Sequence, residues 1–159
     1  MKITLICVGK IKEKYFTMAI GEYTKRLSRY CKLEIIEVSD EKTPDQASEA
    51  QENQIKKLEG ERILKNIKDG AYFIALAIEG SMLTSVELAD KIEQLGVNGS
   101  SHLVFVIGGS LGLSNEVLLR ADYKLSFSKM TFPHQMMRVI LLEQIYRAYR
   151  INTNQPYHK

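Results

Sequence analysis

The stretch HLVFVIGGSLG, residues 102–112, sets the fold class of this chain. After His102 its strand-forming part is apolar on both faces, and a run of glycines follows directly. Strands that are apolar on both sides are typical of parallel sheets covered by helices on each face. A second such run, AYFIALAI at residues 71–78, follows the turn-forming pair Asp69-Gly70. We therefore predict an α/β protein with a mostly parallel sheet.

Apolar periodicity places further elements around these two strands. Strands are expected at residues 2–8, 32–38 and 123–128, and helices at residues 13–30, 46–67, 84–95, 114–121 and 133–150. Alternating strands and helices are typical of a three-layer α/β domain. No linker, repeat or low-complexity segment divides the sequence, so residues 1–159 are expected to form a single domain.

Local signals support several of these boundaries. Thr84 with Glu87 matches the capping-box pattern, and Ser114 is suited to cap the short helix that follows it. Pro133 is at home in a first helical turn. Gly60 weakens the helical pattern of residues 46–67, whose apolar stripe is thin. The helix after Pro133 is apolar on most sides, which predicts cover from the sheet and from another subunit.

Positive charge gathers at the two ends of the chain, although the net charge is a modest +3. Residues 1–33 carry eight Lys and Arg against two Glu, and residues 129–159 carry five against Glu143 alone. This distribution would suit a polyanion partner if the fold or an oligomer brought the ends together. Two solvated basic faces are the other interpretation, and both stay open on charge alone.

Several classes of protein are disfavoured by composition. No long apolar run predicts a membrane span or a secretory signal, so we expect a cytoplasmic protein. Cys7 and Cys31 lack metal-ligand spacing, and Cys7 is expected to be a small core residue. Three histidines alone do not make a convincing metal set, so no metal is expected.

Three strand ends carry the features of a ligand site. They are AIEGSM (77–82), VIGGSLG (106–112) and SFSKMTFPH (126–134), and ligands of open parallel sheets bind beyond such carboxyl ends. Neither a dinucleotide-binding glycine pattern nor a phosphate-binding P-loop is present. Glycines at the first two ends (Gly80, Gly108, Gly109 and Gly112) leave space for a flat ligand or a sharp turn. An uncharged, adenosine-like ligand suits the pattern better than a triphosphate.

One rival interpretation is a serine hydrolase. GGSLG at residues 108–112 matches the nucleophile-elbow pattern, and Asp122 and His134 follow Ser110 in the order of a hydrolase triad. The elbow serine should lead directly into a helix, however, and Gly112 with Ser114 delays the helix here. Ser110 is better suited to a ligand-binding turn.

The chain as a whole resembles RlmH-type members of the SPOUT methyltransferase superfamily. The motifs that carry the resemblance are MKITLICVGKIKEKY (1–15), FVIGGSLGLS (105–114), LSFSKMTFPHQMMRVILLEQIYRAYRI (125–151) and NQPYHK (154–159). The resemblance implies a C-terminal trefoil knot, a homodimer, and S-adenosylmethionine as methyl donor. It implies cofactor binding by Leu76, Gly108, Phe127, Ser128, Lys129, Met130, Thr131 and Phe132.

The implied substrate is a pseudouridine in the helix 69 loop of large-subunit (23S) ribosomal RNA, methylated at N3 on the assembled ribosome. Arg147, Tyr157 and His158 are the expected catalytic residues. Arg147 would bind phosphate or stabilise the developing anion of the base, Tyr157 would stack on or orient the base, and His158 would accept the proton or bind RNA. In a dimer, the tail that carries Tyr157 and His158 could complete the neighbouring site. A non-catalytic ribosome-binding protein is the third class that stays in view.

Overall fold

The computed structural model describes residues 1–159 and contains one five-stranded sheet, in which every pair of neighbouring strands is parallel. The strands are β1 (Lys2–Val8), β2 (Lys32–Val38), β3 (Tyr72–Met82), β4 (His102–Ile107) and β5 (Tyr123–Ser126). Their order across the sheet is β2-β1-β4-β3-β5. The expected α/β architecture with a parallel sheet is confirmed, whereas the knot stays a prediction.

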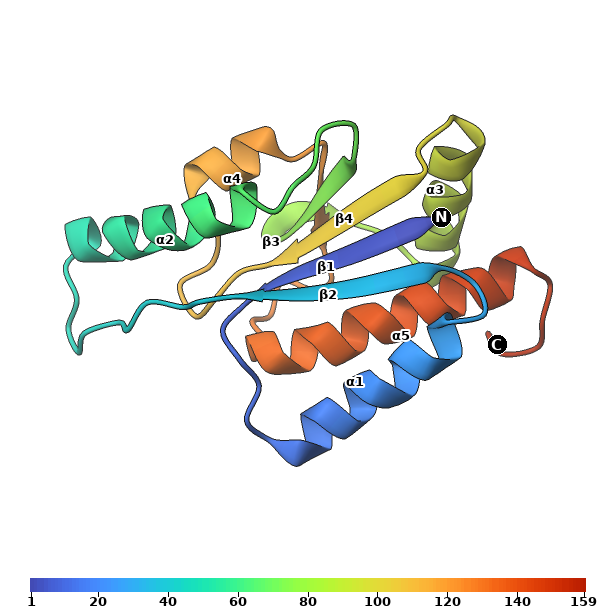
Figure 1. The fold of residues 1–159 in the computed structure, drawn as a ribbon, viewed down its shortest axis with the longest axis horizontal. Helices are drawn as coiled ribbons and strands as arrows, with labels where there is room; N and C mark the ends of the chain where they lie inside the picture. Colours follow the sequence, from blue (N-terminus) through green and yellow to red (C-terminus); the bar gives the residue numbers. More distant parts are fainter.

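Five helices cover both faces of the sheet. They are α1 (Lys14–Leu27), α2 (Glu49–Leu64), α3 (Ser85–Val97), α4 (Asn115–Arg120) and α5 (His134–Asn152). One core cluster joins α1, α3 and α5 to the sheet, and a second joins α2 and α4 to the opposite face. Figure 1 shows α1 and α5 side by side on one face, with α2 and α4 on the other. The three layers predicted from the sequence are therefore present. No helix combines the length and the apolar character that crossing a bilayer would need.

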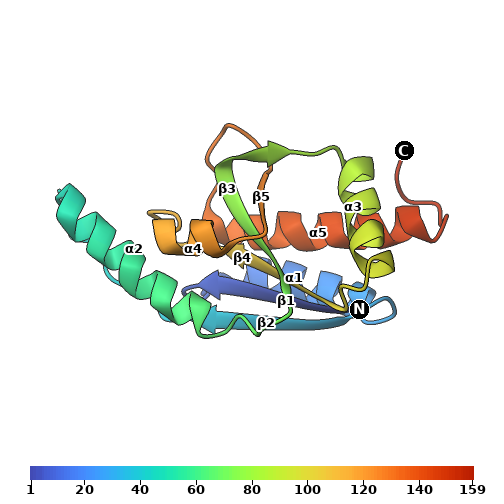
Figure 2. The same cartoon turned by 90° about the horizontal axis from the view of Figure 1, so that it is seen from above.

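Helix α2 packs on the molecule from Ile55 onwards. Its buried residues are Ile55, Glu59, Gly60 and Ile63, while its first turns project from the sheet (Figure 2). The helix begins after a capping box at Ser48, later than expected, because Gln46 adopts a positive φ of 55°. Gly60 does not interrupt it. A Cβ at Gly60 would lie 2.5 Å from Ser114 Oγ, so glycine permits the close packing of α2 on α4.

Two boundaries differ from the sequence prediction at the carboxyl edge of the sheet. β3 runs on to Met82, and its pairing with β5 shifts between Leu76 and Ser81. Residues 77–80 therefore have no partner in β5. A Cβ at Gly80 would lie 2.7 Å from the carbonyl group of Lys124, which explains why this irregular segment carries a glycine. β5 in turn ends at Ser126, two residues earlier than expected.

Helix α5 lies between α1 and α3, and its buried residues are Leu141, Leu142, Ile145, Ala148 and Arg138. The two neighbouring helices thus supply much of the cover that the sequence predicted from another subunit. Arg138 is 2% exposed and donates hydrogen bonds to Glu37 Oε2 at 2.6 Å and to the carbonyls of Val8 and Gly9 at 3.1 and 2.8 Å. Arg138 therefore ties the first turns of α5 to the carboxyl ends of β1 and β2.

Candidate functional site

Three neighbouring strands bring the expected cofactor residues to one edge of the sheet. Leu76 lies in β3 opposite Leu125 of β5, Gly108 follows β4, and residues 127–132 follow β5. Because β4, β3 and β5 are adjacent and parallel, their carboxyl ends meet at this edge. The structure thus brings these sequence-predicted residues to the same side of the molecule, whereas their role in binding a cofactor stays a prediction.

The glycine-rich turn after β4 folds back on itself. The amide of Gly112 donates to the carbonyl of Gly109 at 3.1 Å, and Gly112 has a positive φ of 87°. A Cβ at Gly108 would lie 2.9 Å from the carbonyl carbon of Gly112. Glycine at position 108 is therefore required by the turn of the chain itself.

The main-chain polar groups of residues 127–132 do not pair with other backbone groups. No backbone–backbone hydrogen bond is formed by any residue from 127 to 132. Two side-chain contacts shape the segment: Ser126 Oγ donates to the carbonyl of Ser128 at 3.1 Å, and the amide of Met130 donates to Ser128 Oγ at 3.0 Å. Main-chain groups normally find partners, so this exposed segment has donors and acceptors to offer a ligand. These groups fit the uncharged, adenosine-like ligand expected from the sequence.

A cavity of about 150 Å³ lies beside this segment. Leu125, Ser126 and Phe127 line it from β5 and the residue that follows, Ser85 lines it from the start of α3, and Gln144 lines it from α5. Phe127 thus contributes both to the expected cofactor segment and to the cavity wall. Gln144 closes the side of the cavity that faces the middle of α5.

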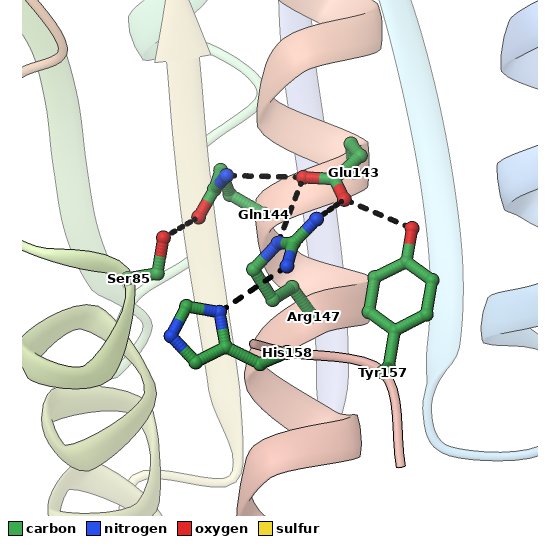
Figure 3. A network of polar contacts seen from close by, with 6 residues as sticks. All are labelled: Ser85, Glu143, Gln144, Arg147, Tyr157 and His158. Atoms are coloured by element: carbon green, nitrogen blue, oxygen red, sulfur yellow. Dashed lines mark hydrogen bonds and ion pairs between the residues drawn. The ribbon is translucent and has the colours of Figure 1, made fainter.

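Gln144 begins a chain of polar contacts along α5, drawn in Figure 3. Ser85 Oγ donates to Gln144 Oε1 at 2.7 Å, and Gln144 Nε2 donates to Glu143 Oε2 at 3.0 Å. Glu143 also accepts from Arg147 Nη2 at 2.7 Å and from the hydroxyl of Tyr157 at 3.0 Å, both at Oε1. One carboxylate therefore holds groups from the cavity wall, from α5 and from the C-terminal tail.

The three residues expected to be catalytic lie together around this carboxylate. The guanidinium of Arg147 lies 4.7 Å from the ring centroid of Tyr157, and Arg147 Nη1 is 3.2 Å from His158 Nδ1. Because a guanidinium can only donate, Nδ1 of His158 accepts this hydrogen bond and the neutral ring carries its proton on Nε2. Figure 3 shows both tail side chains directed at the face of α5 that carries Glu143 and Arg147.

The protonation states of two members of this cluster follow from their surroundings. Partial burial, together with the hydrogen bond to Glu143, raises the pKa of Tyr157 to about 12. Tyr157 is therefore a phenol at neutral pH and acts as a hydrogen-bond donor. The hydrogen bond to Glu143 raises the pKa of Arg147 above its ordinary value, so its guanidinium stays charged.

The hydrolase interpretation is contradicted by where its residues lie. Asp122 precedes β5, where its Oδ2 accepts from the amide of Phe73 and its own amide donates to the carbonyl of Phe73, both at 2.8 Å. Ser110 follows the opposite, carboxyl end of β4. Asp122 is therefore too far along the sheet to orient a base for Ser110. His134 is half-buried beside Arg138, and burial first, then that charge, lowers its pKa.

His102 and Cys7 have structural roles, as the sequence predicts for Cys7. His102 Nε2 lies 2.8 Å from Thr4 Oγ1 at the amino end of the sheet, which is a structural contact between β1 and β4. Cys7 is fully buried, and burial raises its thiol pKa to about 12. No three His, Cys, Asp or Glu side chains lie close enough together to hold a metal ion.

Sequence reasoning missed the residues that organise the site. In the sequence analysis, Glu143 is named only as a single negative charge among basic residues. Its position four residues before Arg147 on a helix nevertheless allows an ion pair. Gln144 and Ser85 carry no sequence signal of their own, because their contact joins residues 59 positions apart. Arg138 is the one charge within the apolar run of residues 136–142, which is a signal of a buried, paired residue.

Comparison with known proteins places the chain among methyltransferases. Residues 1–158 match the family model described as "Predicted SPOUT methyltransferase". Proteins named "Ribosomal RNA large subunit methyltransferase H" from Bifidobacterium adolescentis and Clostridium novyi are 69% and 66% identical over 159 residues, and each match covers both chains completely. A solved structure of a probable methylase family protein from Haemophilus influenzae has a TM-score of 0.56 at 16% identity, covering 99% of this chain and 70% of that one. At that identity the last likeness concerns the fold.

Proposed function

The chain belongs to the SPOUT methyltransferase family, and from that premise we propose that it methylates large-subunit ribosomal RNA with S-adenosylmethionine as methyl donor. Relatives that carry the name of such an enzyme match it along its whole length at 69% and 66% identity. The finer proposal, which rests on the family resemblance, is methylation of N3 of a pseudouridine in the helix 69 loop of 23S RNA on the assembled ribosome.

The observation that carries this proposal is the proximity of two parts of the molecule. The segment of residues 127–132 offers free main-chain groups, and the cluster of Glu143, Arg147, Tyr157 and His158 is joined to the cavity beside that segment through Gln144. A methyl donor and an RNA base must meet between two such surfaces. Leu76, Gly108 and residues 127–132 would hold the adenosine part of the donor.

Bound S-adenosylmethionine supplies a methyl group that is already activated by a positive sulfur, so the protein needs no covalent nucleophile of its own. Positioning of the reacting atoms can then supply much of the rate. Tyr157 would stack on the base, while its hydroxyl keeps the hydrogen bond to Glu143 that orients the ring. Arg147 would stabilise the negative charge that develops as N3 loses its proton.

His158 is the group that would take the proton from N3. In the present arrangement its Nδ1 accepts a hydrogen bond from Arg147. Rotation of Arg147 towards the base would free Nδ1 to accept the N3 proton, and the electron pair left on N3 would bond to the methyl carbon as the methyl–sulfur bond breaks. The guanidinium of Arg147 would therefore lie next to the base as the base becomes negative.

Further parts of the proposal concern partners. Exposed Lys and Arg in residues 1–33, among them Lys12, Lys14 and Lys25, would contact RNA phosphates and make binding sensitive to salt. Met130, Phe132 and Met136, which are 73%, 37% and 40% exposed around the start of α5, support a homodimer, because apolar side chains gathered in this way mark interaction surfaces. The enzyme would act as a single knotted domain in the cytoplasm, where ribosomes are found.

The proposal is tested by comparing the full chain with a variant that lacks residues 155–159. Cofactor affinity is measured by calorimetry, and transfer is measured as label from methyl-labelled S-adenosylmethionine that enters ribosomal RNA of purified ribosomes. We expect the shortened chain to bind the cofactor with unchanged affinity and to lose transfer. A full chain that ignores the cofactor would contradict the proposal. Binding to ribosomes without transfer would favour the non-catalytic alternative.

A further inference from the structure

We propose that Tyr30 and Arg150 are positioning residues, which hold the C-terminal tail (residues 153–159) folded back so that Tyr157 and His158 lie beside Arg147. The inference rests on the proposed role of these two tail residues in methyl transfer. The inference adds a contact between the tail and Tyr30, which follows the end of α1 and is far from the tail in sequence.

The backbone reverses direction just after α5 but does not hold the tail on its own. Asn154 adopts a left-handed φ of 54°, and the amides of Asn154 and Gln155 donate to the carbonyls of Ile151 and Arg150 at 3.1 and 2.9 Å. Such a left-handed turn is a common way to end a helix. Beyond it, residues 156–159 form no backbone–backbone hydrogen bond. Side chains must therefore fix the course of the tail.

Arg150 and Tyr30 converge on the first residues of the tail. Arg150 Nη1 donates to Gln155 Oε1 at 2.6 Å, and Nη2 donates to the carbonyl of Pro156 at 3.1 Å. The hydroxyl of Tyr30 also donates to Gln155 Oε1 and itself accepts from Arg150 Nη1 at 3.2 Å. We call these three side chains, Tyr30, Arg150 and Gln155, the tail clasp.

The clasp is itself held by the body of the molecule. The ring of Tyr30 stacks on that of Tyr149, with centroids 5.5 Å apart and an angle of 16° between the planes. This stacking fixes where the Tyr30 hydroxyl lies. Arg150 occupies the last turn of α5, so the helix fixes where its side chain begins. The clasp therefore ties the tail to α5 and to the turn that follows α1.

Tyr157 follows Pro156 directly, and contacts at exposed or half-buried side chains hold the end of the tail. The ring of Tyr157 meets that of Tyr146 edge-on at 5.0 Å and lies 4.7 Å from the guanidinium of Arg147, and its hydroxyl donates to Glu143. His158 adds one hydrogen bond, from Arg147. Ordering each tail residue costs about 1–2 kcal/mol of backbone entropy, which these contacts alone offset incompletely. Without the clasp, we expect the tail to leave α5 and to take Tyr157 and His158 with it.

No hydrogen bond joins the clasp to the expected cofactor segment. The near end of that segment, Phe127, lines the cavity with Gln144, and a rise of 1.5 Å per residue places Arg150 about 9 Å beyond Gln144 along α5. A change in the clasp should therefore affect the methyl-transfer step and leave cofactor binding intact. This separation distinguishes a positioning role from general damage to the fold.

The experiment compares Arg150→Ala, Arg150→Lys and Tyr30→Phe with the wild-type chain. Arg120→Ala serves as the control, because Arg120 is an exposed arginine on the opposite face of the sheet, in the last turn of α4. Three quantities are measured on the full chain: the rate at which a carboxypeptidase releases the C-terminal residues, the Kd for S-adenosylmethionine, and kcat for ribosome methylation.

For Arg150→Ala we expect release to be about ten times faster and kcat about ten times lower, because two charge-assisted hydrogen bonds are lost, while Kd stays unchanged. Arg150→Lys should also fail to hold the tail in place, because an ammonium lacks the planar fork that reaches Gln155 and Pro156 together. Tyr30→Phe keeps the stacking and should show the same changes to a smaller extent. Arg120→Ala should resemble the wild type.

Three results would overturn the inference: unchanged release and kcat in Arg150→Ala, faster release at an unchanged kcat, or a lower kcat at an unchanged release rate. If the wild-type chain transfers no methyl group, the proposed function fails instead. The carboxypeptidase rates still decide in that case whether the clasp holds the tail.

Discussion

Glu143 accepts a hydrogen bond from the hydroxyl of Tyr157 at 3.0 Å, although the two residues belong to a helix and to the tail that follows it. The same oxygen of Glu143 binds Arg147 at 2.7 Å. One carboxylate thus sets the distance between a permanent cation and an aromatic donor. The arrangement of the proposed catalytic residues depends on a residue that need not touch the substrate.

The substitution Glu143→Gln tests this dependence. The glutamine side chain would keep an oxygen that can accept from Arg147 or Tyr157 but would lose the charge that attracts both. We expect kcat for methyl transfer to fall about tenfold, the effect of weakening a charge-assisted hydrogen bond, with unchanged cofactor affinity. Glu116→Gln, an exposed change in the first turn of α4, is the control. Equal activity of Glu143→Gln and the wild type would show that the carboxylate does not organise the site.

The raised pKa of Tyr157 predicts a specific behaviour in alkali. Its value of about 12 in the folded chain exceeds the ordinary 10, so the folded state binds the phenolic proton more tightly. The stabilisation is fully present below pH 10 and is lost as pH rises towards 12. The ultraviolet phenolate band, taken as the difference between the wild type and Tyr157→Phe, measures this titration. Ionisation of Tyr157 at its ordinary pKa would contradict the contact with Glu143.

Gly108→Ala tests the turn after β4. The new Cβ would lie 2.9 Å from the carbonyl carbon of Gly112, so the turn must shift. We expect cofactor affinity to fall at least about tenfold in calorimetry, which corresponds to a loss of about 1.4 kcal/mol. Gly21→Ala is the control, since a Cβ at Gly21 meets nothing within 4 Å, and alanine in a helix should add up to about 1 kcal/mol of stability. Unaltered affinity in Gly108→Ala would place the cofactor elsewhere.

Arg138→Met tests the contacts that the buried guanidinium of Arg138 makes between α5 and the sheet. Methionine cannot donate to Glu37 or to the carbonyls of Val8 and Gly9, which would lose their partner. We expect the free energy of unfolding to fall by about 2 kcal/mol, because the two buried carbonyls lose a charged donor, whereas the carboxylate of Glu37 is exposed to water. Arg120→Ala should change it by less than about 0.5 kcal/mol, as at other exposed positions. Urea denaturation measures both, and similar losses in the two variants would refute the anchoring role of Arg138.

The layers of this fold could be predicted because its local signals agree. The doubly apolar runs at 71–78 and 102–107 lie in β3 and β4, and Thr84 with Glu87 forms the expected capping box. The strand order β2-β1-β4-β3-β5 could not be read from the sequence, since it depends on contacts between distant segments. The start of α2 was missed because the positive φ of Gln46 is a backbone property that glutamine does not signal.

The site was less accessible to sequence reasoning than the sheet. Its late strand ends could be found from the glycines at two of them and from the position of parallel strands. The grouping of Arg147, Tyr157 and His158 followed from a family resemblance. The structure adds the reason, because Glu143 contacts Arg147 and Tyr157, and Arg147 in turn contacts His158. The tail clasp was not foreseeable, because Tyr30 and Gln155 are 125 residues apart and no sequence pattern links them.

The most direct test of the central claim is mass mapping of 23S ribosomal RNA from cells of the source organism with and without the gene for this chain. The account predicts that deletion removes one methyl group, at N3 of a pseudouridine in the helix 69 loop. The wild-type gene should restore that methyl group, and a gene lacking the codons for residues 155–159 should not. An identical methylation pattern with and without the gene would contradict the account.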